Sequence, residues 1–174
     1  METAVRREPA SGHVRDSRRE PASGHVRDGR TVPCVVLETA GHRCALPMTD
    51  VAEVGRLGTV TRIPGLPTWV PGVTTWRGRV LAVIDLAPLL DPAAGAGGPR
   101  VVVIDVGGVE VGLRCTGVVG VLELDPDAVL PVPAGTGGQA ETLLAGHVVD
   151  ESGPVVILDA DRVLGLHARL AGSL

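Results

Sequence analysis

From residue 33 onward, short apolar runs alternate with breaks that contain glycine or proline. Residues 34–48 (CVVLETAGHRCALPM) hold two such runs separated by Ala40-Gly41, and residues 100–115 (RVVVIDVGGVEVGLRC) hold two runs separated by Gly107-Gly108. Because glycine readily takes the positive φ of a tight turn, both segments predict β-hairpins. In the second arm of the later hairpin, apolar and charged residues alternate, which predicts a strand with one buried face.

Other apolar runs predict additional strands. Residues 79–86 (RVLAVIDL) are apolar on both faces, as expected for a strand in the middle of a fold. Residues 66–75 (LPTWVPGVTT) are interrupted by prolines, which restricts this segment to a loop or an edge strand. Shorter runs predict strands within 59–65, 117–124, 144–149 and 153–159.

Helix is predicted only as pieces of one or two turns. Asp125 precedes a proline suited to the first helical position, and residues 159–165 (DADRVLG) begin with acidic residues and end with glycine. Residues 91–99 and 131–141 are rich in glycine, alanine and proline, which predicts flexible connectors. The first connector falls where a boundary between two small β units is expected.

The first thirty residues contain an identical eleven-residue repeat, RREPASGHVRD, at 6–16 and again at 18–28. Each copy is mostly polar, so it cannot bury enough apolar surface to offset the entropy lost on ordering. Residues 1–30 are therefore predicted to be a disordered tail. A docking peptide with His13 and His25 as metal ligands is the alternative, but one histidine per copy is a sparse ligand set.

Composition and charge narrow the class of protein. Hydrophobic residues make up 44% of the 174 residues, with no Phe or Tyr, so the core must consist of Val, Leu, Ile and Ala. No run reaches the roughly 18 to 20 apolar residues of a membrane span, and the N-terminus lacks a signal peptide; we expect a cytoplasmic protein without membrane insertion. Residues 1–30 carry a net charge of +2 and residues 31–174 a net charge of −6. This acidic body predicts no nucleic-acid partner.

Three carboxylates, Asp85, Asp105 and Asp159, each follow an apolar run. Acids at strand ends can form a metal site or an acid–base pair, but their oxygens also cap turns and short helices, and we favour the capping role. The chain has no GxSxG, HExxH or GxxxxGK[ST] motif, and the GTGG stretch at 135–138 lacks the lysine of a phosphate loop. The sequence therefore predicts no enzyme, no metal and no other cofactor. The alternative, a small β-barrel enzyme or ligand-binding module, would need a deep pocket holding Asp85, Asp159 and a histidine.

The cysteines, Cys34, Cys44 and Cys115, are odd in number and lack CxxC spacing. This pattern argues against a disulfide framework and against a zinc site. Cys115 and His147 are a conceivable nucleophile and base, but Cys115 lies on the apolar face of its predicted strand. We expect three buried, reduced thiols.

Arg77-Gly78-Arg79 precedes the apolar run at 80–86. A guanidinium beside a buried strand must reach solvent or pair with a carboxylate, because an unpaired buried charge is costly. We expect an acidic partner for Arg77, a sharp turn at Gly78 and a solvated side chain for Arg79.

Residues 60–90 (VTRIPGLPTWVPGVTTWRGRVLAVIDLAPLL) resemble the signature of the CheW-like domain family, in which V-x-x-[VI]-P-x-x-P leads to G-V-x-N-x-R-G-x-[IV]-[IVL]-P-V-[IV]-D-L. Residues 109–124 and 143–164 resemble later parts of the same family, so the likeness spans about 31–170. The signature matches are Gly72, Val73, Arg77, Gly78, Val83, Ile84, Asp85 and Leu86, and the departures are Thr75, Ala82 and Cys115-Thr116. The departures bear on partner affinity and not on the fold.

The resemblance implies an all-β fold of two small five-stranded β-barrels on a shared core, with short helical turns. It implies a stand-alone adaptor that joins methyl-accepting chemoreceptors to a CheA-type histidine kinase in bacterial chemotaxis, without catalysis. An adaptor of another chemosensory pathway, controlling pili or development, is equally compatible with the sequence.

The resemblance also implies site residues. In the family the arginine of the R-G motif pairs with a glutamate in the strand before the signature, here Glu53, and we expect a partly buried Glu53–Arg77 ion pair whose loss costs about 2 to 4 kcal/mol. Family receptors dock the tip of a helical hairpin into an apolar groove between the barrels. By alignment, the groove residues are Val35, Met48, Val51 and Val118. Ordinary core positions are the alternative for these four.

Overall fold

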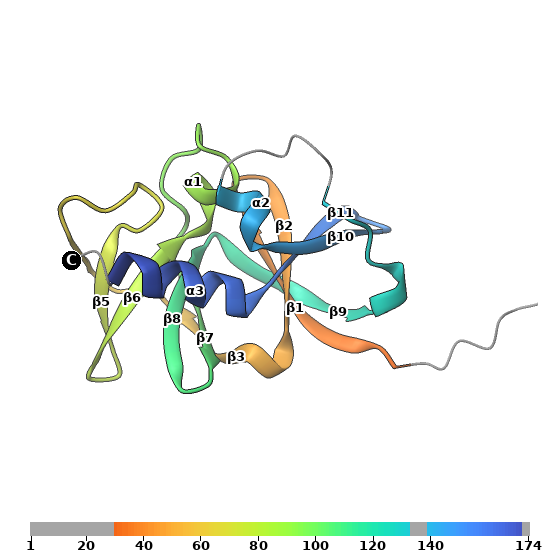
Figure 1. The fold of residues 1–174 in the computed structure, drawn as a ribbon, viewed down its shortest axis with the longest axis horizontal. Helices are drawn as coiled ribbons and strands as arrows, with labels where there is room; N and C mark the ends of the chain where they lie inside the picture. The colour runs from red at the N-terminus through yellow and green to blue at the C-terminus, as the bar shows by residue number, and fades with distance from the viewer. Residues whose placement is uncertain (1–29, 133–138, 172–174) are drawn as a thin grey trace, which may run out of the picture.

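The computed structural model describes residues 30–132 and 139–171. The predicted tail, except Arg30, and the GTGG stretch at 135–138 lie outside these residues. Within the described residues, β-strands form two sheets, with short helical segments between them (Figure 1). The expectation of a strand-dominated fold with few helices is confirmed.

The five-stranded sheet has the order β10-β11-β2-β1-β9. Its neighbouring strands are antiparallel, except that β11 and β2 are parallel. The β1–β2 hairpin turns at Ala40 and Gly41, both with positive φ, as the flanking apolar runs predicted. The strands are β1 (Val32–Thr39), β2 (His42–Pro47), β9 (Gly117–Leu124), β10 (Leu144–Asp150) and β11 (Gly153–Leu158).

The six-stranded sheet has the order β3-β7-β8-β6-β5-β4. Its neighbouring strands are antiparallel, except that β6 and β8 are parallel. The β7–β8 hairpin turns at Gly107 and Gly108, as predicted. The strands are β3 (Val51–Arg56), β4 (Val60–Arg62), β5 (Gly72–Trp76), β6 (Arg79–Asp85), β7 (Arg100–Val106) and β8 (Val109–Cys115).

The restriction of residues 66–75 to a loop or an edge strand was wrong for their second half. β5 lies inside the sheet, paired with β4 on one side and β6 on the other. Pro67 and Pro71 both precede β5, so every residue of the strand keeps the backbone N–H that pairing on two sides requires.

The helical segments are η1 (Met48–Asp50), α1 (Leu86–Leu90), η2 (Pro126–Ala128), α2 (Gln139–Leu143) and α3 (Ala160–Ala171). The prediction that the last helix ends at Gly165 was wrong, because α3 continues to Ala171. Val163 and Leu166, on either side of Gly165, are buried in the main core, and this burial outweighs the small cost of a glycine inside a helix.

Strand pairing within the described residues closes neither sheet, so the prediction of two five-stranded barrels needs correction. The end strands of the six-stranded sheet, β3 and β4, are consecutive in the chain and are joined by residues 57–59. The chain therefore completes the ring without hydrogen bonds between the two end strands. In the five-stranded sheet, Leu130 follows β9 and forms an isolated bridge with His147 of β10. Each unit is a curled sheet whose two ends are linked by one short connection.

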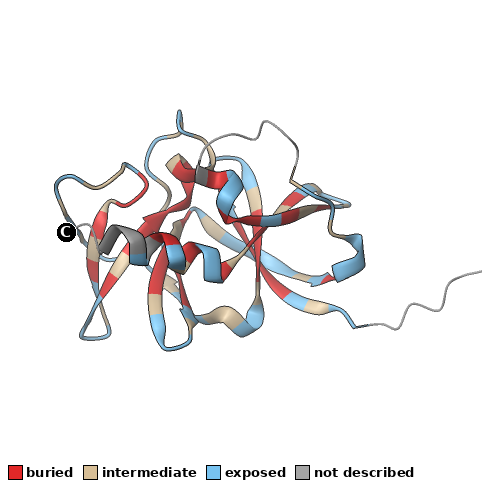
Figure 2. Cartoon of the chain, viewed as in Figure 1, coloured by how far each residue is buried: buried red, intermediate tan, exposed pale blue. Residues whose placement is uncertain are grey.

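The two sheets share one main core, which also receives α3. Fully buried members are Leu37 and Leu46 from one sheet, Ile104 and Leu113 from the other, and Val163 from α3. Burial is concentrated along the middle of the strands, while the hairpin tips are exposed (Figure 2). The core of Val, Leu and Ile expected from the composition is confirmed, and its sharing holds the two sheets together.

Candidate partner-binding surface

The β5–β6 hairpin places Arg77 and Gly78 in its two-residue turn. Both residues have positive φ, 46° for Arg77 and 79° for Gly78. Glycine adopts this conformation readily and arginine uncommonly, and two such residues are what a type I′ hairpin turn requires. The sharp turn expected at Gly78 is therefore present, with Arg77 at its tip.

One carboxylate oxygen, Glu53 Oε2, binds two side chains of this hairpin. It lies 2.7 Å from Arg77 Nε and accepts a hydrogen bond of 2.9 Å from Trp76 Nε1. The Glu53 side chain is 25% exposed and the Arg77 side chain 70% exposed. Since solvent screens so exposed a guanidinium, the ion pair itself contributes about 0.5 to 1 kcal/mol, less than the 2 to 4 kcal/mol expected for a partly buried pair.

The Trp76 ring adds an apolar contact between the same two strands. A side chain at Gly55 of β3 would overlap this ring, so the indole packs directly against the β3 backbone. β3 and β5 are not neighbours in the strand order. Trp76 and Glu53 therefore fasten one end of the curled six-stranded sheet to a strand near its other end.

Gly72, the first residue of β5, is required by its backbone. Its φ is 143°, which side chains rarely adopt, and a Cβ there would overlap the carbonyl oxygen of Thr61 on β4. β4 and β5 are paired at this point, Arg62 opposite Gly72. The signature glycine permits close contact between the two strands.

Asp85, at the end of β6, is 2% exposed and holds a loop in place. Its carboxylate accepts hydrogen bonds from the N–H groups of Ala87 and Gly97, and Arg114 Nη1 lies 3.4 Å away. Arg114 Nε also donates to the carbonyl of Gly98. The connector at 91–99, expected to be flexible, is thus anchored at its second half by a buried carboxylate.

The capping role favoured for the three carboxylates is confirmed. Asp85 caps α1, Asp105 accepts from the N–H of Gly108 in a hairpin turn, and Asp159 accepts from the N–H of Arg162 at the start of α3.

Arg79, expected to be solvated, instead pairs with Glu110 of β8 at 2.9 Å while staying 60% exposed. The parallel pairing of β6 and β8 brings these two side chains together.

Three of the four groove residues from the alignment, Met48, Val51 and Val118, lie near the points where the chain passes from one sheet to the other, whereas Val35 lies within β1. Val35 of β1 is 8% exposed and belongs to the main core, against which Val51 at the start of β3 is half-buried. Met48 in η1 is 41% exposed, and Val118 on β9 is 39% exposed. η1 contacts both β1 and β7. Two of the four residues therefore face the core and two face solvent.

A further exposed residue, Val121, lies on the same face of β9 as Val118. Val121 is paired with Val35 and Val118 with Leu37, whereas the register between β1 and β9 shifts by one residue at Val36/Leu37. This β-bulge places Val118 and Val121 on one face although they are three residues apart. We call the residues Val35, Met48, Val51, Val118 and Val121 the β9–η1 surface.

Of the positions that depart from the family pattern, Thr75 and Ala82 lie in the β5–β6 hairpin, whereas Thr116 is two residues before Val118 of this surface. Thr75 is exposed on β5, and Ala82 is paired with Val73 and Val111 on its two sides. The Thr116 N–H donates to the carbonyl of Glu38 on β1, a link between the two sheets. This link uses the backbone, so it does not depend on the Thr116 side chain.

The three cysteines are buried and free, as expected. Burial raises the pKa of the Cys44 thiol to about 12 and that of Cys115 to about 11, and it also raises the pKa of Cys34. Neutral thiols are poor nucleophiles and poor metal ligands. Within the described residues, no hydrogen bond joins Cys115 to His147, whose buried Nδ1 has no partner.

Two surface pockets lie beside β4, and neither has the lining that the enzyme alternative would need. One of about 300 Å³ is formed by β4 and the loop that follows it, and one of about 380 Å³ lies over β4, β5 and the start of β6. Asp85, Asp159, His42 and His147 line neither pocket. Across the described residues, no group of three or more His, Cys, Asp or Glu side chains is arranged to hold a metal ion. Within the same residues, no helix has the length and apolar character needed to cross a membrane.

Two small curled β-sheets on one shared core, with an apolar surface beside the junction between them, define a protein-binding β domain. The family model described as CheW-like domain matches residues 33–167, and the chain belongs to this family. Proteins of this family are non-catalytic scaffolds, which agrees with the expectation that the chain is not an enzyme.

Three known proteins illustrate the relationship. Protein FrzA of Myxococcus xanthus is 36% identical over 113 residues, covering 64% of this chain and 69% of FrzA. Protein PilI of Pseudomonas aeruginosa is 42% identical over 50 residues, covering 29% of this chain and 28% of PilI. The crystal structure of the scaffolding protein TtCheW from Thermoanaerobacter tengcongensis has a TM-score of 0.66 at 23% identity, covering 78% of this chain and 89% of TtCheW. That structural likeness shows the shared fold.

Proposed function

We propose that this protein is a cytoplasmic adaptor that couples methyl-accepting chemoreceptors to a CheA-type histidine kinase. Membership of the CheW-like family supports the adaptor class. The observation that carries the receptor-binding role is the β9–η1 surface. There, exposed Val121 is paired with the core residue Val35, exposed Val118 is paired with Leu37, and η1, which holds exposed Met48, contacts β1. An apolar surface of this kind suits the apolar side chains of a helical hairpin tip.

The hairpin that carries Arg77 supports this surface without belonging to it. Glu53, which holds Arg77 and Trp76, lies on β3 two residues after Val51 of the surface. Fixing β3 against the β5–β6 hairpin therefore fixes the position of Val51. In this proposal the polar cluster preserves the shape of the docking surface, and the apolar residues make the contacts.

A second candidate is an adaptor of another chemosensory pathway, controlling pili or development. The sequence similarity to Protein FrzA and Protein PilI supports this candidate, because neither relative is named as a CheW protein. Both candidates use the same fold and the same surface, and they differ in the receptor and kinase that bind.

The test is a titration of the full chain against the cytoplasmic hairpin of a chemoreceptor and, separately, against the regulatory domain of a CheA-type kinase from the same genome. We expect saturable binding to both, and we expect Val118→Asp and Val121→Asp to weaken receptor binding at least tenfold. Val149→Asp is the matched control, because Val149 is 68% exposed on β10 at the opposite edge of the same sheet.

One outcome distinguishes the two candidate functions, and another tests whether the receptor binds at the β9–η1 surface. Binding to kinases and receptors of another chemosensory system, with none to those of chemotaxis, would support the second candidate. Equal binding by all three aspartate variants would place the receptor contact away from the β9–η1 surface.

A further inference from the structure

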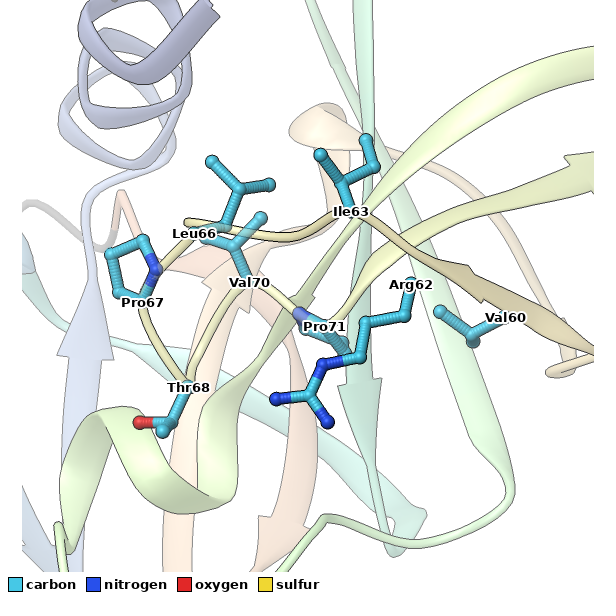
Figure 3. Close-up of a pocket in the computed structure, with 8 residues that line it drawn as sticks. All are labelled: Val60, Arg62, Ile63, Leu66, Pro67, Thr68, Val70 and Pro71. Atoms are coloured by element: carbon cyan, nitrogen blue, oxygen red, sulfur yellow. The ribbon is translucent and has the colours of Figure 1, made fainter.

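The pocket formed by β4 and the loop after it combines an apolar lining with one arginine. Its volume is about 300 Å³, and its polar side chains are those of Arg62 and Thr68. Figure 3 shows Arg62 extending from β4 toward the side of the pocket on which Thr68 lies. The apolar lining consists of Val60, Ile63, Leu66, Val70 and two prolines.

The apolar lining is fixed by the core behind it. Val70 is 6% exposed and belongs to the main core, and Leu66 packs against that core. The Val70 N–H donates to the carbonyl of Pro67 at 2.9 Å, and the neighbouring Trp69 carbonyl accepts from the N–H of Asp85 at 2.8 Å. The pocket is therefore held open before a ligand arrives, which lowers the entropic cost of binding.

β4 presents its side chains to two different pockets. Val60 and Arg62 line the first pocket, whereas Thr61 between them lines the second. This alternation is that of a strand, with residues two apart on one face. β4 is the end strand of its sheet and is paired with β5 on one side. A segment bound along β4 in extended form would place alternate side chains opposite Val60 and Arg62.

Arg62 is suited to receive a negative charge. Its side chain is exposed, and within the part of the chain that the structure describes no carboxylate lies within ion-pair distance of it. Residues 31–174 carry a net charge of −6, so an unpaired arginine beside an apolar pocket stands against the overall charge of the body. An apolar group next to a carboxylate complements this combination.

We propose that this pocket binds an extended segment of a partner protein with the pattern apolar–x–acidic. The apolar side chain enters the pocket beside Val60, and the acidic side chain two positions away pairs with Arg62. None of the residues that line this pocket belongs to the β9–η1 surface, so the site is an additional contact of the scaffold and does not depend on which receptor or kinase it serves.

The test uses capped heptapeptides added to the full chain, with binding followed by NMR of backbone amides. The probe peptide has Leu-Thr-Glu at its centre, and the matched peptides have Leu-Thr-Gln and Ala-Thr-Glu. We expect the probe to shift the amide signals of Thr61, Ile63 and Val70, and each matched peptide to bind about tenfold more weakly.

Two arginine variants decide whether Arg62 is responsible. Arg62→Gln should remove the preference for Glu over Gln in the peptide, while Arg56→Gln, which changes an exposed arginine on β3, should leave that preference unchanged. No binding of the probe at about 1 mM, equal binding of the Glu and Gln peptides to the natural protein, or signal changes confined to β9 would each overturn the proposal. Loss of receptor or kinase binding by other variants would not affect these peptide measurements.

Discussion

The two sheets are held in shape by different means. The six-stranded sheet has polar and steric links at several points: Glu53 with Trp76 and Arg77, Asp85 with the 91–99 loop, and Gly72 against β4. The five-stranded sheet is linked at its ends by the bridge between Leu130 and His147, and by an ion pair between Arg43 and Asp150. Of the links in the six-stranded sheet, the one at Glu53 joins strands that are not neighbours, and the other two fix a loop and a directly paired strand.

The exposed apolar residues are grouped differently in the two sheets. In the six-stranded sheet, Val54, Val80 and Val109 lie on three different strands. On β9, at the edge of the five-stranded sheet, Val118, Val119 and Val121 are all exposed. An exposed apolar edge strand invites association with other proteins, and monomeric proteins usually protect such edges with charges. Under the proposed function, the six-stranded sheet would provide the frame and β9 of the five-stranded sheet would contribute partner contacts.

The largest expected effect breaks the frame at Gly72. Gly72→Ala would force a side chain into a φ of 143° and against the Thr61 carbonyl. We expect a loss of about 3 kcal/mol or more in the free energy of unfolding, measured by chemical denaturation. Gly117→Ala on β9, where a Cβ meets nothing within 4 Å, is the control and should cost about 1 kcal/mol or less. Equal losses of unfolding free energy in the two variants would mean that a glycine is no more necessary at Gly72 of the six-stranded sheet than at Gly117 of the five-stranded sheet.

The next effect concerns the buried carboxylate of the frame. Asp85→Ala removes an acceptor for two backbone N–H groups and a partner for Arg114, all in a site that is 2% exposed. We expect a loss of about 2 to 3 kcal/mol and faster hydrogen exchange at Gly97. Asp105→Ala, at an exposed hairpin turn, should cost about 1 kcal/mol or less. Unchanged exchange at Gly97 would show that the loop does not need Asp85.

The parts of the fold that the sequence predicted are those set by local patterns. Gly107-Gly108 between two apolar runs defines a hairpin without information from elsewhere, and the same holds for Ala40-Gly41. The extent of α3 beyond Gly165 was missed because it depends on burial of Val163 and Leu166 against another sheet. Closure of the sheets was mispredicted because β3 and β4, although consecutive in the chain, lie at the two ends of the six-stranded sheet and are not paired with each other.

The site divides in the same way. The turn at Gly78 was predicted from local chemistry. The pairing of Glu53 with Arg77 came from the family resemblance, because these two residues lie far apart in sequence. Val121 was missed, since strict alternation along β9 places it on the face opposite Val118, and the bulge that changes this leaves no mark in the sequence. The contact of Trp76 with Gly55 likewise requires the curled sheet.

A smaller effect sharpens the comparison at the hairpin of the frame. Glu53→Ala removes the acceptor for both Trp76 and Arg77, and we expect it to cost about 1 to 2 kcal/mol. Arg77→Ala should cost about 0.5 to 1 kcal/mol, because Arg77 is 70% exposed. A double-mutant cycle should give a coupling of about 0.5 kcal/mol that falls in high salt. A coupling of zero at low salt would leave the hydrogen bond from Trp76 as the only contribution of Glu53.

The smallest effect concerns the five-stranded sheet and depends on pH. Arg43 Nη1 and Nη2 lie 2.6 and 2.8 Å from the two carboxylate oxygens of Asp150, a link between β2 and β10 across β11. These hydrogen bonds from Arg43 lower the pKa of Asp150 below its ordinary value of 3.8. A carboxyl group whose folded pKa is lowered stabilises the fold above its unfolded pKa, and this contribution disappears as the pH falls through the folded pKa.

Asp150→Asn should therefore lower the free energy of unfolding by a constant amount at pH values well above 3.8, and the difference from the natural protein should shrink as the pH falls below 3.8 and through the folded pKa. Arg43→Met removes the cause of the pKa shift and should flatten the same part of the pH profile. Both residues are on the surface, so the difference should be small and should shrink further in salt. If the difference instead grew as the pH fell, Asp150 would stabilise the fold in its protonated form. The ion pair between Arg43 of β2 and Asp150 of β10 would then not stabilise the five-stranded sheet.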